Sequence, residues 1–77
     1  MKNILVVGAG GQIGSELIPF LRARYGASHV VATDIDESKC KKLSDGPFEK
    51  LDAMNGNQFA EVVKKYKIDA IYNMVAL

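Results

Sequence analysis

A cluster of glycines between an apolar run and an amphipathic segment constrains this chain more than any other feature. Residues 4–7 are Ile-Leu-Val-Val, an uninterrupted apolar run typical of strands that are buried on both faces of a parallel sheet. The glycines that follow are Gly8, Gly10, Gly11 and Gly14. A helical pattern begins at Gln12, so a strand, a tight turn and a helix N-terminus come in the order that a phosphate-binding turn requires.

Gly8, Gly11 and Gly14 have the spacing G-x-x-G-x-x-G, with Gly10 as an additional glycine, and different roles are expected for these positions. Gly8 allows a sharp exit from the strand, which often requires a positive φ. Gly10 and Gly11 leave no side chain between backbone N–H groups and a pyrophosphate, and Gly14 lets the helix pack closely on the sheet. The free N–H groups and the dipole of the helix N-terminus then face the anion. The alternative is a flexible turn without a ligand.

Two acidic residues end the next two expected strands. Asp34 closes the strand expected at residues 29–34 and lies 20 positions after Gly14. A carboxylate there can accept hydrogen bonds from both hydroxyls of an adenosine ribose, and its charge repels a 2′-phosphate, which favours NAD over NADP. Asp52 closes the strand expected at residues 48–52 and can accept a hydrogen bond from the amino group of an adenine. The structural alternatives are a turn cap for Asp34 and a solvated loop acid for Asp52.

The first helix is expected to begin at Gln12 and to end at Gly26, a residue type favoured just beyond a helix C-terminus. Its apolar stripe consists of Ile13, Leu17, Phe20, Leu21 and Tyr25. Arg22 and Arg24 lie near its end, where positive charge opposes the helix dipole. Pro19 removes a backbone donor, but the stripe continues across it, so one kinked helix is expected.

Two more helices and a fourth strand complete the pattern. A short helix begins at Asp36, and a longer one has Asn57 as its expected N-cap. The apolar face of the longer helix consists of Phe59, Val62, Val63 and Tyr66. Residues 68–75 are expected to form a fourth buried strand.

The alternation of strands and helices predicts an α/β fold, β-α-β-α-β-α-β, with a four-stranded parallel sheet and right-handed crossovers. We predict the strand order 3-2-1-4, which is that of a partial Rossmann fold. This order puts the fourth strand at an edge of the sheet, where an apolar strand favours pairing with another chain. A homodimer through the fourth strand is therefore expected as one arrangement.

Composition argues against several classes of protein. The chain has 77 residues, 48% hydrophobic and 25% charged, as an ordinary small soluble domain does. A net charge of +1 gives no electrostatic reason to expect nucleic acid or a membrane as partner, and no apolar run reaches the length of a membrane span. The single cysteine, Cys40, fits a reducing compartment, so we expect a cytoplasmic location. Asp34 and Asp36 lack the further ligands that a metal site needs, and no metal is expected.

Residues 7–17, 31–35 and 69–77 resemble the extended short-chain dehydrogenase/reductase family. Within it the likeness is greatest to L-threonine 3-dehydrogenases of the short-chain type, with nucleotide-sugar epimerases as the neighbouring group. The proline-bearing segment 17–21 and the turn at residues 46–49 are similar to those enzymes as well. The likeness covers essentially the whole chain but only the N-terminal part of such an enzyme. Residues 1–77 are accordingly expected to form a single, truncated cofactor-binding half-domain without a substrate domain.

The resemblance implies NAD as cofactor and assigns residues to each part of it. Around the pyrophosphate it implies Gly8, Gly11, Gln12, Ile13 and Gly14. At the adenosine ribose it implies Asp34 and Ile35, and at the adenine Asp52 and Ala53. Where the fourth strand ends, the residues implied to line the cofactor are Met74, Val75 and Ala76. The family usually carries a smaller residue at the position of Val75.

The family's hydride transfer depends on a Tyr-x-x-x-Lys motif with a Ser or Thr, and this chain has no such motif. Four positions after its three tyrosines stand His29, Ala70 and Ala76. No catalytic residue is therefore expected, and the resemblance implies that the chain alone is not an active oxidoreductase. Three hypotheses remain: a module that binds the adenosine and pyrophosphate of NAD, a part of an active oxidoreductase completed by another segment, and a self-associating structural fragment that binds no ligand.

Overall fold

Four parallel strands and three α-helices form the part of the chain that the structure, a computed structural model, describes, residues 2–41 and 43–74. The elements are β1 (Ile4–Val7), α1 (Gln12–Tyr25), a 3₁₀ turn η1 (Ala27–His29), β2 (Val30–Asp34), α2 (Glu37–Lys41), β3 (Phe48–Lys50), α3 (Gly56–Lys65) and β4 (Ala70–Asn73). The sheet has the order β3-β2-β1-β4 with every pair parallel, so the predicted fold class and strand order are confirmed. Among the described residues, every helix is too short or too polar to cross a bilayer.

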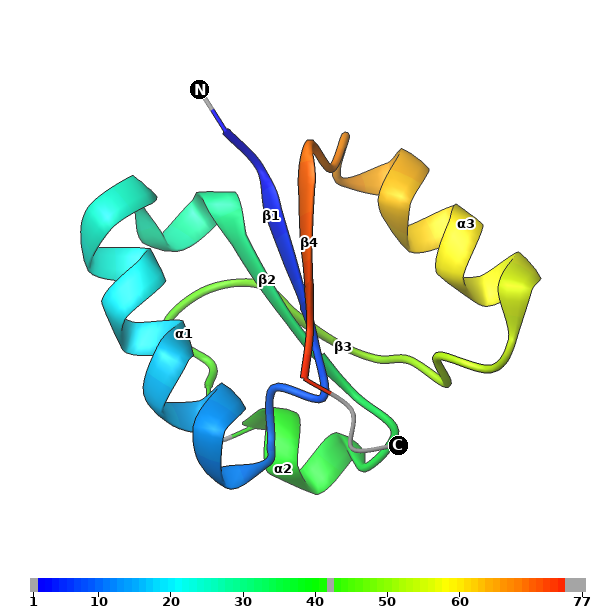
Figure 1. Cartoon of the computed structure of the whole chain (residues 1–77), viewed down its shortest axis with the longest axis horizontal. Coiled ribbons are helices and arrows are strands. Elements are labelled where there is room, and N and C mark those ends of the chain that lie inside the picture. Colours follow the sequence, from blue (N-terminus) through cyan, green and yellow to red (C-terminus); the bar gives the residue numbers. More distant parts are fainter. Residues whose placement is uncertain (1, 42, 75–77) are drawn as a thin grey trace.

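The central strand β1 explains why the sheet has two separate cores. Figure 1 shows α1 on one side of the sheet and α3 on the other. Ile4 and Val6 pack with residues of α1, whereas Leu5 and Val7 pack with residues of α3, because successive side chains of a strand point to opposite faces. All four residues are at most 1% exposed. The uninterrupted apolar run of β1 is therefore the consequence of burial on both faces.

The predicted apolar stripe of α1 is confirmed in part: Leu17, Leu21 and Tyr25 pack in the core on this side of the sheet, but two other members of the stripe do not. The buried residues of the helix are Gly14, Ile18, Leu21 and Arg22. Ile13 and Phe20, which belonged to the predicted stripe, are 67% and 65% exposed. The reason lies at Gly14, where an added Cβ would stand 2.6 Å from the Gly8 carbonyl oxygen. This close approach holds the helix against the turn at Gly14. A hydropathy pattern does not identify a glycine as a buried residue, so it does not reveal this contact. The helix runs continuously across Pro19, which is exposed.

The predicted apolar face of α3 is confirmed, but its predicted N-cap is wrong. Phe59, Val62, Val63 and Tyr66 all belong to the core on the α3 face of the sheet. The N-cap is Asn55, whose side-chain oxygen accepts a hydrogen bond from the Gln58 N–H at 3.1 Å. The helix therefore begins two residues earlier than an N-cap at Asn57 would allow.

Strand β4 is exposed, which contradicts the prediction of a fourth buried strand over residues 68–75. It pairs only with β1 and forms the edge of the sheet, so Ile71, Tyr72 and Asn73 are exposed. An apolar run cannot by itself distinguish a strand with two neighbours from one with a single neighbour. Val75 lies outside the described residues.

Two smaller differences concern the ends of β2 and β3. His29, expected to open the second strand, instead ends η1, and its Nδ1 lies 2.8 Å from Asn3 Oδ1. Strand β3 ends at Lys50 rather than at Asp52. The Leu51 N–H still donates to the Asp34 carbonyl at 2.9 Å, so the chain stays beside β2 as it leaves β3.

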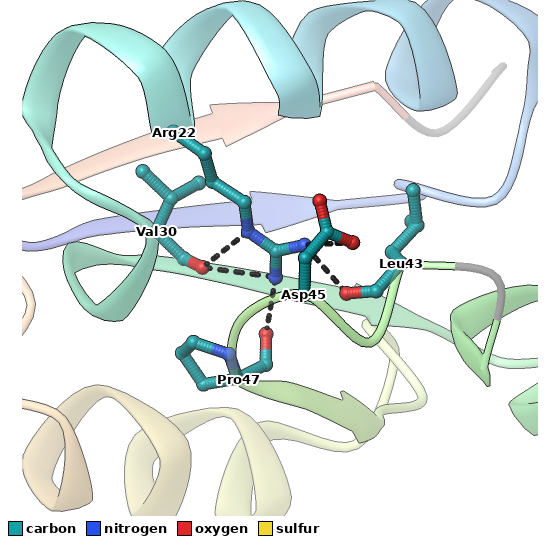
Figure 2. A network of polar contacts seen from close by, with 5 residues as sticks. All are labelled: Arg22, Val30, Leu43, Asp45 and Pro47. Carbon is teal, nitrogen blue, oxygen red and sulfur yellow. Dashed lines mark hydrogen bonds and ion pairs between the residues drawn. The ribbon is translucent and has the colours of Figure 1, made fainter.

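Arg22 is a buried cation that joins α1 to the loop before β3 (Figure 2). Its side chain donates to the carbonyl groups of Val30, Leu43 and Pro47, and it lies 3.8 Å from the Asp45 carboxylate. Burial lowers the pKa of the Arg22 guanidinium from its ordinary value, and the charge of Asp45 opposes that shift. The sequence correctly put Arg22 in the last turn of α1, but its side chain turns inward to these carbonyls.

Candidate functional site

A cavity of about 540 Å³ opens where all four strands end. The predicted site residues that line it are Gly8, Gly11, Gln12, Ile13, Gly14, Asp34, Ile35, Asp52, Ala53 and Met74. The structure thus brings together every predicted site residue that it describes. Val75 and Ala76 lie outside the described residues. The carboxyl edge of a parallel sheet is where α/β proteins bind ligands, although the roles given to the individual residues stay predictions.

The glycine turn directs the N-terminus of α1 at this cavity. Gly8 has a φ of +78°, so the predicted positive φ is confirmed. The Gly11 N–H donates to the Gly8 carbonyl at 3.2 Å, and the first hydrogen bond of the helix runs from the Ser15 N–H to the Gly11 carbonyl. The N–H groups of Gln12 and Ile13 have no acceptor among the described residues. They are donors at the positive end of the helix dipole, and both residues line the cavity.

Gly10 serves a different purpose from the predicted one. It does not belong to the cavity lining of the described chain, and its N–H donates to Asp34 Oδ2 at 3.0 Å. A Cβ added to Gly10 would clash with the Cβ of Lys39. The glycine is therefore needed because α2 packs directly against the turn. Only the tertiary structure reveals this contact, since Lys39 is remote in sequence.

Asp34 joins the glycine turn to the start of α2 while it also faces the cavity. Besides the contact with Gly10, its Oδ1 accepts a hydrogen bond from the Asp36 N–H at 3.0 Å. The alternative of a turn-capping acid is thus realised in the structure, and it is compatible with a ligand because each carboxylate oxygen has two lone pairs. Two backbone donors fix the orientation of this carboxylate at the cavity wall.

The opposite wall of the cavity comes from the segment after β3. Asp52 lines the cavity, and its Oδ1 accepts from the Met54 N–H at 2.9 Å. Met54, Ile13 and Ile35 also line the cavity and are 93%, 67% and 62% exposed. Three apolar side chains left open to water around one cavity form a surface that a flat aromatic ring can cover.

Sequence reasoning missed four residues of the cavity lining: Val7, Lys39, Leu51 and Met54. Val7 and Leu51 directly precede the predicted residues Gly8 and Asp52. Their positions at the ends of strands could therefore have identified them as cavity residues. Met54 follows the predicted Asp52 and Ala53. Lys39 reaches the cavity from α2 and carries no local signal of this position.

Comparisons with known proteins agree with this geometry. The model of a family described as the NAD dependent epimerase/dehydratase family matches residues 4–77. An uncharacterized epimerase/dehydratase of Staphylococcus epidermidis is 42% identical over 78 residues, which cover 100% of this chain and 24% of the relative. The chain therefore spans about a quarter of the length of that relative.

Two solved structures extend the comparison. An L-threonine dehydrogenase from Clostridium difficile has a TM-score of 0.90 at 42% identity, with 100% of this chain and 24% of that chain covered. A dTDP-glucose 4,6-dehydratase from Bacillus anthracis, solved in complex with NAD, has a TM-score of 0.85 at 26% identity, with 100% of this chain and 27% of that chain covered. The resemblance predicted from residues 7–17, 31–35 and 69–77 is confirmed.

Proposed function

This chain belongs to the NAD dependent epimerase/dehydratase family, and on that premise we propose that it binds NAD through the adenosine and pyrophosphate of the cofactor. One observation carries the proposal. A single cavity at the carboxyl edge of the sheet collects a helix N-terminus with unused N–H groups, two carboxylates and an apolar rim. These are the donors, acceptors and flat surfaces that an adenosine diphosphate requires.

In this proposal the pyrophosphate lies at the N-terminus of α1. The N–H groups of Gln12 and Ile13 donate to its oxygens, and the helix dipole favours the negative charge. Gly11 is exposed at the mouth of the cavity, and the nearest atom to an added Cβ, the Gly8 carbonyl oxygen, is 3.5 Å away. A larger side chain at Gly11 can be built but projects into the space that the anion needs.

The adenosine lies between the ends of β2 and β3. Asp34 accepts hydrogen bonds from the ribose hydroxyls, and Ile35 packs on the sugar. Asp52 and Ala53 bind the adenine, and Met54 covers it. Because Asp34 repels a 2′-phosphate, NAD is preferred over NADP.

The function of a whole protein built on this segment is a further proposal. The identity of 42% with an L-threonine dehydrogenase, against 26% with a dTDP-glucose dehydratase, favours an oxidoreductase that acts on L-threonine. In such an enzyme this segment holds the cofactor, Met74, Val75 and Ala76 line it where β4 ends, and another segment supplies the catalytic Tyr and Lys. The homodimer through β4 has no support in the structure or in the comparisons.

Titration calorimetry of the chain with NAD, ADP and NADP tests the proposal. We expect NAD and ADP to bind with similar affinity, because the adenosine diphosphate makes the contacts, and NADP to bind more weakly. Asp34→Ala should weaken NAD binding by about tenfold or more, since a charged acceptor is lost. Glu61→Ala removes the same charge from the exposed face of α3 and is the matched control. The absence of binding by the unaltered chain, or equal binding of NAD and NADP, would contradict the proposal.

A further inference from the structure

We infer that Gln58 is a positioning residue for the adenine end of the cavity: its carboxamide holds the backbone of Asp52 so that the carboxylate of Asp52 faces the amino group of a purine. The inference rests on the proposed binding of an adenosine diphosphate. It concerns a residue that does not line the cavity in the described chain and therefore acts only through its neighbour.

The carboxamide of Gln58 bridges two backbone groups at the end of β3. Its Oε1 accepts a hydrogen bond from the Asp52 N–H at 2.9 Å, and its Nε2 donates to the Lys50 carbonyl at 3.4 Å. Lys50 is the last residue of β3, and Asp52 is the first cavity acid beyond it. Gln58 therefore fixes the direction in which the chain leaves the sheet.

This contact departs from the usual capping box of a helix. In a capping box the third helical residue, a Glu or Gln, reaches back to the N–H of the N-cap. Gln58 is the third residue of α3, but the N–H of the N-cap, Asn55, already donates to the Asp52 carbonyl at 2.9 Å. The side chain of Gln58 reaches three residues further back instead, to the Asp52 N–H.

The same turn fixes the side chain of Asp52. Its Oδ1 accepts from the Met54 N–H at 2.9 Å, and its Oδ2 has no hydrogen-bond partner among the described residues. With the backbone held by Gln58 and one oxygen held by Met54, the second oxygen is an oriented acceptor at the cavity. Such an acceptor matches the exocyclic amino group of adenine, and it is repelled by the carbonyl oxygen that replaces this group in hypoxanthine.

The capping of α3 and the positioning of Asp52 use different atoms of Gln58. The cap bond to Asn55 comes from the main-chain N–H of Gln58, which almost any other residue also provides. The bonds to Asp52 and Lys50 come from its side chain. A change of the side chain alone therefore tests positioning while the cap stays in place.

The test compares ADP with inosine 5′-diphosphate in calorimetry, because the two ligands differ at the purine position that faces Asp52. We expect the unaltered chain to prefer ADP by about tenfold, the effect of one hydrogen bond to a charged group. Gln58→Met keeps the side-chain volume and loses both bonds, and the preference should fall to within about threefold. Gln58→Glu keeps an acceptor for the Asp52 N–H and should retain most of the preference. Lys64→Met, on the exposed face of α3, is the control that should change nothing.

The ratio of the two affinities separates positioning from a structural role. A general loss of order weakens both ligands equally and leaves the ratio unchanged. A preference for ADP that persists in a folded Gln58→Met overturns the inference while the proposed function stands. If Gln58→Met does not fold, a loss of the preference in Gln58→Glu overturns it in the same way. Failure of the unaltered chain to bind either ligand overturns the proposed function, and the inference with it.

Discussion

The Arg22 guanidinium donates a hydrogen bond to the Pro47 carbonyl at 2.7 Å (Figure 2). The same carbonyl also accepts a hydrogen bond from the Ala32 N–H at 3.0 Å. One oxygen thus joins the end of α1, the middle of β2 and the start of β3. Because β3 leads directly to Leu51 and Asp52, this junction supports from outside the wall of the cavity that these two residues line.

Replacement of Arg22 should therefore lower the stability of the fold. Arg22→Met leaves the carbonyl groups of Leu43 and Pro47 without this donor, and we expect it to lower the free energy of unfolding by about 3 kcal/mol. Arg24→Met, at an exposed position of the same helix, should change it by less than about 0.5 kcal/mol. Urea denaturation followed by circular dichroism measures both. Equal effects of the two substitutions would mean that the carbonyl contacts contribute nothing.

The glycines offer a matched pair of substitutions. Gly14→Ala places a Cβ 2.6 Å from the Gly8 carbonyl and 2.8 Å from the Ala9 Cα, so α1 must move away from the turn. We expect a loss of about 1–3 kcal/mol in the free energy of unfolding. Gly56→Ala meets no atom within 4 Å at the start of α3 and should stabilise by up to about 1 kcal/mol. In thermal unfolding, we expect the melting temperature to fall for Gly14→Ala and to rise or stay unchanged for Gly56→Ala. A melting temperature of Gly14→Ala equal to that of the unaltered chain would contradict the close packing at Gly14.

The corrected N-cap of α3 can be tested in the same way. Asn55→Ala removes the acceptor of the Gln58 N–H and should lower the free energy of unfolding by about 1 kcal/mol. Asn57→Ala lies inside the first turn and should have an effect below about 0.5 kcal/mol. If urea denaturation showed that Asn57→Ala lowers the free energy of unfolding more than Asn55→Ala does, Asn57 rather than Asn55 would be the N-cap.

The features that the sequence predicted are those with a local signal. The glycine spacing, the acid at the end of β2 and the apolar face of α3 each involve residues that are close along the chain. The strand order was predicted by analogy with the Rossmann fold that the glycine turn indicates, not from the local signals themselves. A glycine turn must follow a strand and precede a helix to bind a phosphate, and this requirement limits the folds that can contain it.

Several of the features that were missed depend on contacts that form only when the chain is folded. Arg22 has the position of a solvated cation at a helix end, and its inward direction follows from three carbonyl groups that only the folded chain assembles. Gln58 has the position of a capping-box residue, and its contact with Asp52 depends on where β3 ends. The burial of β4 was mispredicted because its neighbours, rather than its own residues, decide how much of it is exposed.

The N-terminus of α2 should respond to pH. Asp36 accepts hydrogen bonds from the Ser38 hydroxyl at 2.6 Å and from the Ser38 N–H at 3.0 Å, and the hydroxyl bond is the main reason that the pKa of Asp36 lies below its ordinary value of 3.8. A carboxyl with a lowered pKa stabilises the fold above its ordinary pKa, and this contribution is lost as the pH falls through the lowered value. We therefore expect the amide resonance of Ser38 in a ¹⁵N-correlated NMR spectrum to move toward its unfolded position only below that ordinary value. Ser38→Ala should shift the midpoint of this transition, followed at the Asp36 carboxyl, upward in pH. A midpoint that does not change on removal of the hydroxyl would show that the Ser38 side chain does not stabilise the charged form of Asp36.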